Sequence, residues 1–171
     1  MPDQSTANLL MVRPTQFRRN EQTAVNNHYQ QTLAGRTEEE ITDLALSEFD
    51  NFARTLQDAG VRVFIFDADA DFDAPDALFP NNWVSFHANG DIGLYPMFAE
   101  NRRVERREDI LIDLEHLQGF HVDQIVDFTE FEEHGKFWRG SASIVLARQH
   151  TRAYAALSPR TDRVAFEQFC E

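Results

Sequence analysis

The acidic stretch 67–76 holds side chains of the type that binds calcium. It contains five aspartates, and carboxylate oxygens are the usual protein ligands of Ca²⁺. An EF-hand loop that began at Asp67 would also need glycine at its sixth position and glutamate at its twelfth, but these positions hold Phe72 and Leu78. We therefore interpret the stretch as a solvated loop and predict no metal site in it.

The six histidines and the single cysteine do not form a zinc or nucleophile pattern. His116 and His121 are separated by Gly119 and do not lie one helical turn apart, as two zinc ligands on a helix would. Cys170 is the only cysteine, which excludes an internal disulfide and favours a cytoplasmic setting. The sequence also has no glycine-rich phosphate loop and no serine elbow. We expect no metal and no cofactor, and we assign no catalytic residue.

A repeated motif places polar residues at the entrance of predicted hairpins. The sequence FPNNWVSF begins at Phe79 and FWRGSASI begins at Phe137, and this alignment matches Asn82 with Gly140. Asn89-Gly90 follows the first copy, and an Asn-Gly pair between apolar runs is typical of a type I′ hairpin turn. Repeated hairpins of this kind suggest modules that present side chains toward a shared centre.

Helices and further strands are predicted around these hairpins. A capping box at Thr37 and Glu40 begins a helix that Gly60 ends. A second helix is predicted over 106–118 with Leu117 on its apolar face, and a third begins near 161 with Val164 on its apolar face. The strands are predicted at 8–14, 61–66, 83–87, 92–97, 122–128, 141–148 and 152–158, and 61–66 reads as a buried strand flanked by helices. The stretch 15–31 is predicted to be an irregular, functional loop.

The order of these elements predicts an α+β domain of repeated strand-strand-helix-strand modules. We place the modules at about 8–66, 79–129 and 137–171 within one partial domain, 1–171, and the last module is incomplete. A strand without a partner leaves backbone donors and acceptors unpaired. The pattern therefore predicts either the front part of a larger repeat protein or a homo-oligomer that forms through open sheet edges.

The charge of the chain excludes some classes of partner. The formal net charge is −13 and the sequence pI is about 4.8, whereas a nucleic-acid surface needs clustered lysine and arginine. No apolar run is long enough to span a bilayer, and the first residues lack the layout of a signal peptide. We expect neither nucleic acid nor membrane as a partner.

Several motifs together resemble the guanidino-group-modifying superfamily, the penteins. They look closest to the arginine-deiminase-related, amidinotransferase-like branch that includes citrulline hydrolases. The motifs cover nearly the whole chain, and they are MVRP at 11–14, NEQTA at 20–24, FPNNWVSFH at 79–87, LYPM at 94–97, NRRVERR at 101–107 and SPRTD at 158–162. The resemblance implies an α/β propeller of five modules in a protein about twice this length, of which this chain would hold about two and a half.

The resemblance also implies an activity. Such enzymes are hydrolases or amidinotransferases that act on the guanidino or ureido group of arginine- or citrulline-like substrates. A cysteine attacks and a histidine handles protons, and in the family both lie in the second half, so Cys170 is not assigned as the nucleophile. The isolated chain is therefore expected to be inactive. The alternative is a non-catalytic relative that binds an amino acid or a partner protein.

Two residues that match the family's motifs are expected to bind the substrate. Asn82 falls where many relatives place an aspartate that holds the guanidinium, and an amide can both donate to and accept from a ureido group. Its alternative role is a turn residue that bonds local backbone. Arg160 matches an arginine that relatives use for the substrate α-carboxylate, and its alternative role is a surface salt bridge.

Three further arginines complete the expected set. Arg103 or Arg106 is expected to assist with the carboxylate, and the alternative is pairing with nearby acidic residues along the helix, namely Glu105, Glu108 and Asp109. Arg139 stands where relatives have a catalytic glutamate. A positive charge there would repel a guanidinium by several kcal/mol in a low-dielectric pocket, which implies either an inactive copy or a neutral or anionic ligand.

Overall fold

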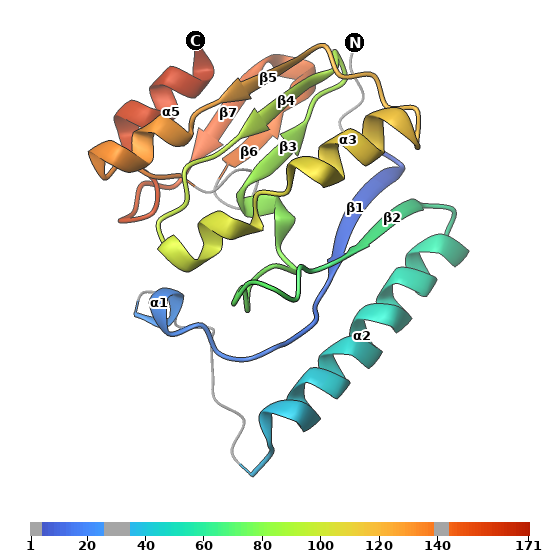
Figure 1. Ribbon diagram of the computed structural model, residues 1–171. Helices are drawn as coiled ribbons and strands as arrows, with labels where there is room; N and C mark the ends of the chain where they lie inside the picture. Colours follow the sequence, from blue (N-terminus) through green and yellow to red (C-terminus); the bar gives the residue numbers. More distant parts are fainter. Residues whose placement is uncertain (1–4, 26–34, 139–143) are drawn as a thin grey trace. The chain divides into compact units, whose positions relative to one another are not determined.

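The computed structural model describes residues 5–25, 35–138 and 144–171, and the chain forms two compact units. The first unit is Thr6–Pro80, and the second includes Asn81–Glu171. Both combine helices with small sheets (Figure 1). The mixed α/β class predicted from the sequence is confirmed.

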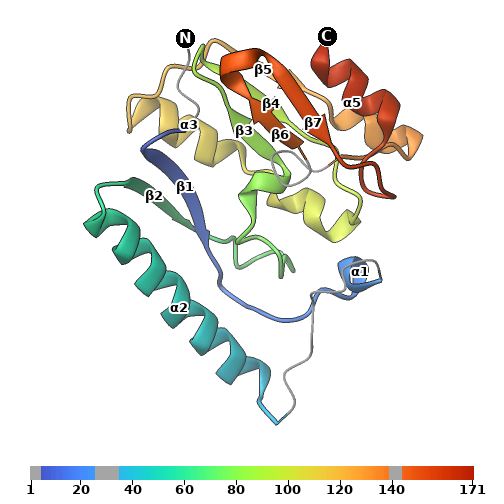
Figure 2. The same ribbon diagram turned by 180° about the vertical axis from the view of Figure 1, so that it is seen from behind.

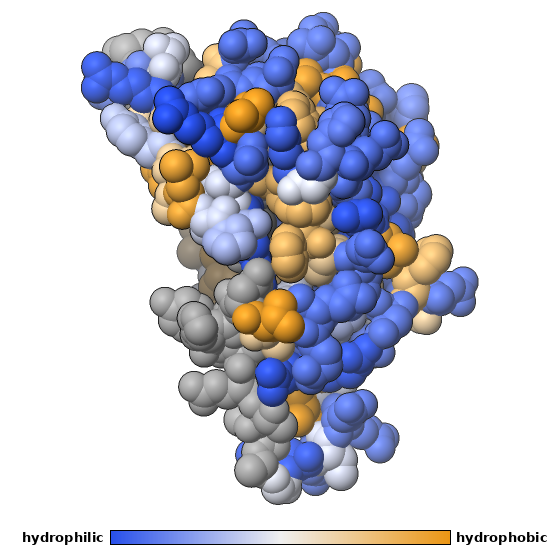
Figure 3. All heavy atoms as spheres, turned by 90° about the vertical axis from the view of Figure 1, so that its left-hand side faces the viewer, coloured by the Kyte–Doolittle hydropathy of each residue, from blue (hydrophilic) through white to orange (hydrophobic). Residues whose placement is uncertain are grey.

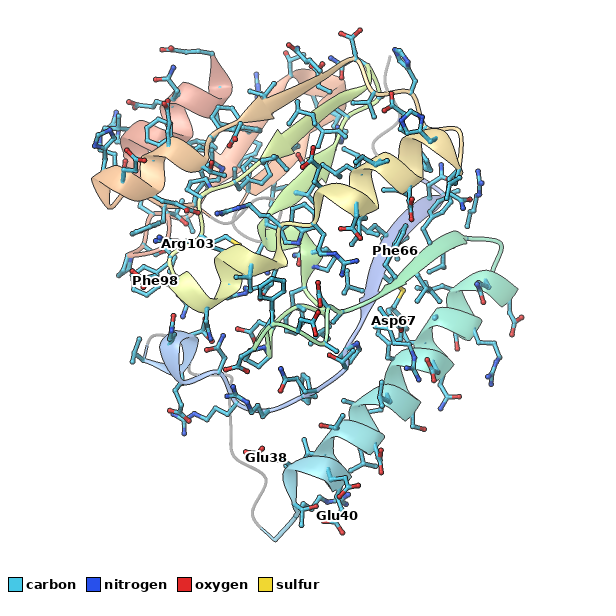
Figure 4. All side chains as sticks on the ribbon, in the orientation of Figure 1. Glu38, Glu40, Phe66, Asp67, Phe98 and Arg103 are labelled. Atoms are coloured by element: carbon cyan, nitrogen blue, oxygen red, sulfur yellow. The ribbon has the colours of Figure 1, made fainter. Side chains whose placement is uncertain are left out.

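The first unit consists of a parallel pair of strands and a long helix. Strand β1 (Asn8–Arg13) pairs in parallel with β2 (Arg62–Asp67), and α2 (Glu38–Asp58) connects them. The predicted capping box is present: Glu40 N–H donates to Thr37 Oγ1 across 3.2 Å, and Thr37 N–H donates to Glu40 Oε2 across 2.9 Å. Figure 4 marks Glu38 and Glu40 in the first turn, where negative charge favours the helix dipole.

Helix α2 is fastened to β1 and to the segment that follows it. Arg13 donates from Nε and NH2 to the two carboxylate oxygens of Asp50, across 2.8 and 2.9 Å. Phe17 N–H donates to Thr42 Oγ1 across 3.0 Å. The predicted strand at 61–66 is confirmed to within one residue, but the expectation that it is buried is wrong in part, because Ile65 is exposed. A short helix, α1 (Glu21–Ala24), interrupts the stretch that was expected to be irregular.

The second unit contains the predicted strand-strand-helix-strand module. Strands β3 (Val84–Phe86), β4 (Asp91–Leu94) and β5 (Gln124–Asp127) form one sheet in that order, antiparallel and then parallel. The 3₁₀ segment η2 (Glu100–Glu105) and helix α3 (Glu108–His116) connect β4 to β5. The short 3₁₀ segments η1 (Pro80–Asn82) and η3 (Thr129–His134) precede β3 and follow β5.

The turn between β3 and β4 differs from the predicted type I′ turn. That turn needs positive φ at both central residues, but only Gly90 has it, at +95°. Gly90 N–H donates to His87 O across 3.0 Å, and His87 N–H donates to Asp91 O across 2.9 Å. The turn is therefore a longer loop closed by a glycine in the left-handed region, which is the other common hairpin connection.

A second hairpin and a helix follow. Strands β6 (Ile144–Ala147) and β7 (Arg152–Ala155) are antiparallel and are joined by η4 (Arg148–His150), as the repeat predicted. Helix α5 (Arg163–Cys170) is capped by Asp162, whose side chain accepts from Ala165 N–H across 3.0 Å. Figures 1 and 2 show α3 and the β6–β7 hairpin on opposite faces of the β3–β4–β5 sheet.

An aromatic core joins the sheet to the second hairpin. Tyr95 and Trp138 are fully buried with Ile144 and Ala165. The Tyr95 and Trp138 rings lie edge to face at 5.8 Å, a favoured geometry for aromatic pairs. Further rings pack around them, namely Phe128, Phe131 and Phe169. This cluster fixes the end of β4, where the predicted site residues begin.

Two expectations about apolar faces are wrong. Leu117 was placed on the buried face of the second helix, but α3 ends one residue earlier and Leu117 is 71% exposed. Val164 was placed on the buried face of the third helix, but it is exposed and Ala165 is buried instead. In both cases the packing partner, and not the helical spacing, determined which residues are covered.

Hydrophilic side chains cover most of the face shown in Figure 3, and hydrophobic side chains are scattered among them. Within the described ranges, no helix is long and apolar enough to cross a membrane.

Candidate functional site

The segment Tyr95–Phe98, directly after β4, gathers the predicted arginines. Arg106 donates from NH1 to the Tyr95 carbonyl across 3.4 Å. Arg103 donates from Nε to the Met97 carbonyl across 3.3 Å. Both arginines come from the NRRVERR motif: Arg103 lies in η2, and Arg106 directly follows it. Figure 4 labels Phe98 and Arg103 in this region.

Arg160, from the turn that precedes α5, also contacts the segment Tyr95–Phe98. Its guanidinium carbon lies 5.8 Å from the centroid of the Phe98 ring, within range of a cation–π interaction. The Phe98 ring also packs edge to face on Phe137 at 5.4 Å. Arg160 sits in a tight turn closed by Ser158 and Thr161. It is buried, which argues against the alternative of a surface salt bridge.

Glu132 links two of these arginines, and no motif in the sequence indicated this residue. Its carboxylate accepts from Met97 N–H across 2.7 Å, lies 3.2 Å from Arg103 Nε, and binds both terminal nitrogens of Arg106. The residue lies in η3, 26 positions from Arg106. No local spacing could have indicated a pair so distant in the chain.

The alternative predicted that Arg103 and Arg106 pair with acidic residues along the helix, but both contact Glu132. Two of the three acidic residues named for that alternative bind other arginines. Arg102 forms a buried two-bond pair with Glu105, at 2.9 and 2.7 Å, and Arg107 pairs with Asp109.

A hollow of about 530 Å³ opens beside Arg103. Its lining also includes Glu132 and Thr129 together with three further acidic side chains, which are Asp127, Glu130 and Glu133. The hollow therefore presents a guanidinium and a hydroxyl against several carboxylates. Such a surface can bind a ligand that carries both signs of charge, since each sign finds its opposite.

Asn82 is buried at the end of η1, immediately before the fully buried Trp83. Its side-chain nitrogen lies 3.5 Å from the Asn81 side-chain oxygen, a weak local contact. Its burial gives a polar amide near the start of β3, as the motif predicted. The last predicted residue, Arg139, lies outside the described residues.

A second polar cluster, formed by Asp76, Asn20 and Thr23 in the first unit, was not predicted from the sequence. Asp76 was read as part of a solvated loop, but it is buried, and it accepts from Asn20 Nδ2 across 2.7 Å and from Thr23 Oγ1 across 3.1 Å. Two of the partners belong to the stretch that was predicted to be a functional loop. The available signal was the apolar run Ala74-Pro75 and Ala77-Leu78 around Asp76, which sets it apart from the other aspartates. In the described part of the chain, this cluster included, no group of three or more His, Cys, Asp or Glu side chains could hold a metal ion.

A chain of hydrogen bonds runs through the second unit from the core to η4. Ser85 Oγ lies 2.5 Å from Tyr95 OH and 2.9 Å from His87 Nε2. Arg148 lies 3.4 Å from His87 Nδ1. Burial, and then the charge of Arg148, lower the pKa of His87. Burial raises the pKa of Tyr95. Both His87 and Tyr95 are therefore uncharged near neutral pH.

The only cysteine is not arranged as a nucleophile. Cys170 is exposed and unbonded at the end of α5. Burial, and then the charge of Glu167, raise the pKa of its thiol. A reactive cysteine needs the opposite shift, because the thiolate is the attacking form.

The sequence matches one family model over most of its length. Residues 13–171 match the model described as eukaryotic N,N dimethylarginine dimethylhydrolase. No curated protein matches the sequence significantly.

Solved structures share the fold. The substrate-bound N-terminal domain of ArgZ, an arginine dihydrolase from Cyanobacteria, gives a TM-score of 0.65 at 14% identity, over 94% of this chain and 52% of that chain. A dimethylarginine dimethylaminohydrolase adduct with S-methyl-L-thiocitrulline gives 0.59 at 21% identity, over 94% and 54%. AgrE bound to L-arginine gives 0.62 at 15% identity, over 94% and 21%. The chain thus spans about half the length of the first two, and the resemblance to penteins is confirmed.

Proposed function

Because this chain belongs to the family of eukaryotic N,N-dimethylarginine dimethylhydrolases, we propose that its second unit binds an arginine- or citrulline-like amino acid. The observation that supports this most directly is the convergence of Arg103, Arg106 and Arg160 on the segment Tyr95–Phe98. A planar guanidinium binds a carboxylate with two parallel hydrogen bonds, which makes arginine well suited to the α-carboxylate of an amino acid.

The remaining predicted residues concern the other end of the ligand. Asn82 is proposed to contact the guanidino or ureido group, since its amide can donate to a ureido oxygen and accept from an N–H. Arg139 is proposed to disfavour a cationic guanidinium by charge repulsion. Together they favour a citrulline-like, neutral ureido ligand over arginine.

We further propose that the chain forms about two and a half modules of a five-module propeller. The β3–β4–α3–β5 arrangement supports a strand-strand-helix-strand repeat. The isolated chain is proposed to bind ligand without turnover, which is supported by the raised pKa of Cys170. It is also proposed to associate through its sheet edges, since β6 and β7 form a sheet of only two strands within the described residues, and each strand therefore has an open edge.

Calorimetric titration of the 171-residue chain against citrulline, arginine and agmatine tests the proposal. Agmatine has the guanidinium of arginine but lacks the α-carboxylate. We expect citrulline to bind more tightly than arginine, and agmatine not to bind detectably. Arg103→Gln should weaken citrulline binding by about ten- to a hundredfold, the loss expected for hydrogen bonds between charged groups. Asp109→Asn is the control, because it removes an exposed partner of Arg107 outside the group. Equal affinities for all three ligands, or none, would overturn the proposal.

The second candidate is a non-catalytic binding protein, and the position of Cys170 favours it over an enzyme for this chain alone. Release of ornithine or ammonia from citrulline, measured beside the titration, tests for turnover by this chain. Turnover that disappears in Cys170→Ala would identify Cys170 as a nucleophile, and it would contradict both the binding-only role and the proposal that the isolated chain does not turn its ligand over. Binding without turnover agrees with both.

A further inference from the structure

Glu132 is bound on two sides by positive charge. Its side chain is 10% exposed, and its carboxylate accepts from Met97 N–H while contacting Arg103 and Arg106. A buried carboxylate is tolerated only when it is paired and hydrogen-bonded. With one negative charge between two guanidinium groups, this trio retains one net positive charge.

The two arginines are attached to Glu132 in different ways. Arg106 uses both terminal nitrogens against both carboxylate oxygens, and NH1 also donates to the Tyr95 carbonyl. Arg103 makes its contacts through Nε, at 3.3 Å to the Met97 carbonyl and 3.2 Å to Glu132 Oε2. The terminal nitrogens of Arg106 are therefore occupied by contacts within the protein. Arg103 is held through Nε, and it is the arginine of the pair that lines the hollow.

We infer that Glu132 is a positioning residue, which locks Arg106 into the fold and orients the terminal nitrogens of Arg103 toward the carboxylate of an amino-acid ligand. The inference rests on the proposed function and deepens it by separating the roles of the two arginines. Arg103 is the cation among the residues that line the hollow, so its guanidinium is the group there that can pair with a ligand carboxylate. Asp127, Glu130 and Glu133 line the same hollow, and they attract the α-ammonium of the same ligand. The head group recognised is thus the zwitterion of an α-amino acid.

Chemical labelling of arginine tests the positioning without needing a ligand. Phenylglyoxal modifies accessible guanidinium groups, and mass spectrometry locates the modified positions. In the unaltered chain, Arg103 should react faster than Arg106, although their side chains are similarly exposed, at 30% and 21%. Glu132→Gln keeps the shape of the side chain but removes its charge. It should accelerate labelling of Arg106 about tenfold, equivalent to 1.4 kcal/mol.

A ligand-protection arm tests the recognition. Citrulline and arginine should slow the labelling of Arg103, whereas agmatine, which lacks the carboxylate, should not. This protection should be lost in Glu132→Gln and partly restored in Glu132→Asp, which returns the charge at a shorter reach. Asp109→Asn is the matched control, because it removes a carboxylate from a nearby exposed pair with Arg107. It should change neither the labelling of Arg106 nor the protection of Arg103.

The two arms fail separately. Equal labelling rates of Arg103 and Arg106, unchanged by Glu132→Gln, would overturn the positioning role whether or not a ligand binds. Equal protection by agmatine and citrulline would overturn the carboxylate role of Arg103. Faster labelling of Arg106 in Glu132→Gln, with no protection by any of the three ligands, would support the lock on Arg106 and overturn the proposed function.

Discussion

Arg148 donates a hydrogen bond to Nδ1 of His87 across 3.4 Å, and this contact sets the tautomer of the imidazole. Because arginine can only donate, Nδ1 must be the acceptor and the proton must sit on Nε2. Nε2 then donates to Ser85 Oγ across 2.9 Å. The His87 nitrogen that faces Ser85 already carries a proton, so His87 cannot accept the Ser85 hydroxyl proton as a base. Its neutral form instead connects the β3–β4 hairpin to η4.

Acidification should weaken the fold through His87. Its ordinary pKa is 6.5, and burial followed by the charge of Arg148 lowers the pKa in the folded state, while Asp91 opposes them. A group whose folded pKa is depressed lets the unfolded chain bind the extra proton first, so stability falls as pH drops below 6.5. Thermal unfolding from pH 7.5 to 5 should show a steeper loss in the unaltered chain than in His87→Gln. Arg148→Gln should also flatten the curve, because it removes the repelling charge, and identical slopes in all three would contradict this role.

Replacing Gly93 should strain the core. A Cβ added at Gly93 would lie 2.7 Å from the Tyr95 hydroxyl and 3.1 Å from Ser85 Oγ, and Tyr95 is held among aromatic rings. Gly93→Ala should therefore cost about 1–3 kcal/mol in the free energy of unfolding, as overpacked cores do. Tyr95→Phe removes the hydroxyl and keeps the ring. In a double-mutant cycle by urea denaturation, Gly93→Ala should cost less in the Tyr95→Phe background, and strictly additive losses would argue against the contact.

Breaking the buried Arg102–Glu105 pair should be far more costly than breaking an exposed one. The two side chains are 7% and 1% exposed, so Glu105→Gln would remove a negative charge that is paired with a buried guanidinium. The expected loss is about 3–5 kcal/mol. Glu167→Gln removes the exposed partner of Arg163 and should cost less than about 1 kcal/mol. Comparable denaturation midpoints for the two variants would show that water reaches the Arg102 guanidinium.

Charge reversal at position 139 should change ligand preference. If Arg139 repels a guanidinium, Arg139→Glu should strengthen binding of arginine by about ten- to a hundredfold and leave citrulline within about tenfold. Arg139→Gln separates removal of the positive charge from addition of a negative one, and it should give an intermediate gain. Calorimetric titration of the three proteins against both ligands measures the preference. Arginine affinity that is unaffected by either variant would mean that residue 139 does not face the ligand.

Much of the fold was predictable because its signals are local. The helix Glu38–Asp58 begins at the predicted capping box, in which Thr37 and Glu40 bond each other three positions apart. The Asn89-Gly90 pair between two apolar runs placed β3 and β4, and the alternation of polar and apolar residues over 122–128 placed β5. The repeat of FPNNWVSF predicted the β6–β7 hairpin. In each case the residues that form the element also carry its hydrogen-bonding or patterning signal, so neighbours along the chain were enough.

The candidate site was only half predictable. The motifs indicated Asn82, Arg103, Arg106 and Arg160, and the sequence alone established their residue types and order. Their partners come from distant positions: Glu132 lies 35 residues from Met97, and Asp76 lies 56 residues from Asn20. A buried charge selects whichever opposite charge the packing brings within reach, and that choice has no trace in local spacing. The tertiary structure therefore decided which arginine serves the fold, which one lines the hollow, and which aspartate of the acidic stretch is buried.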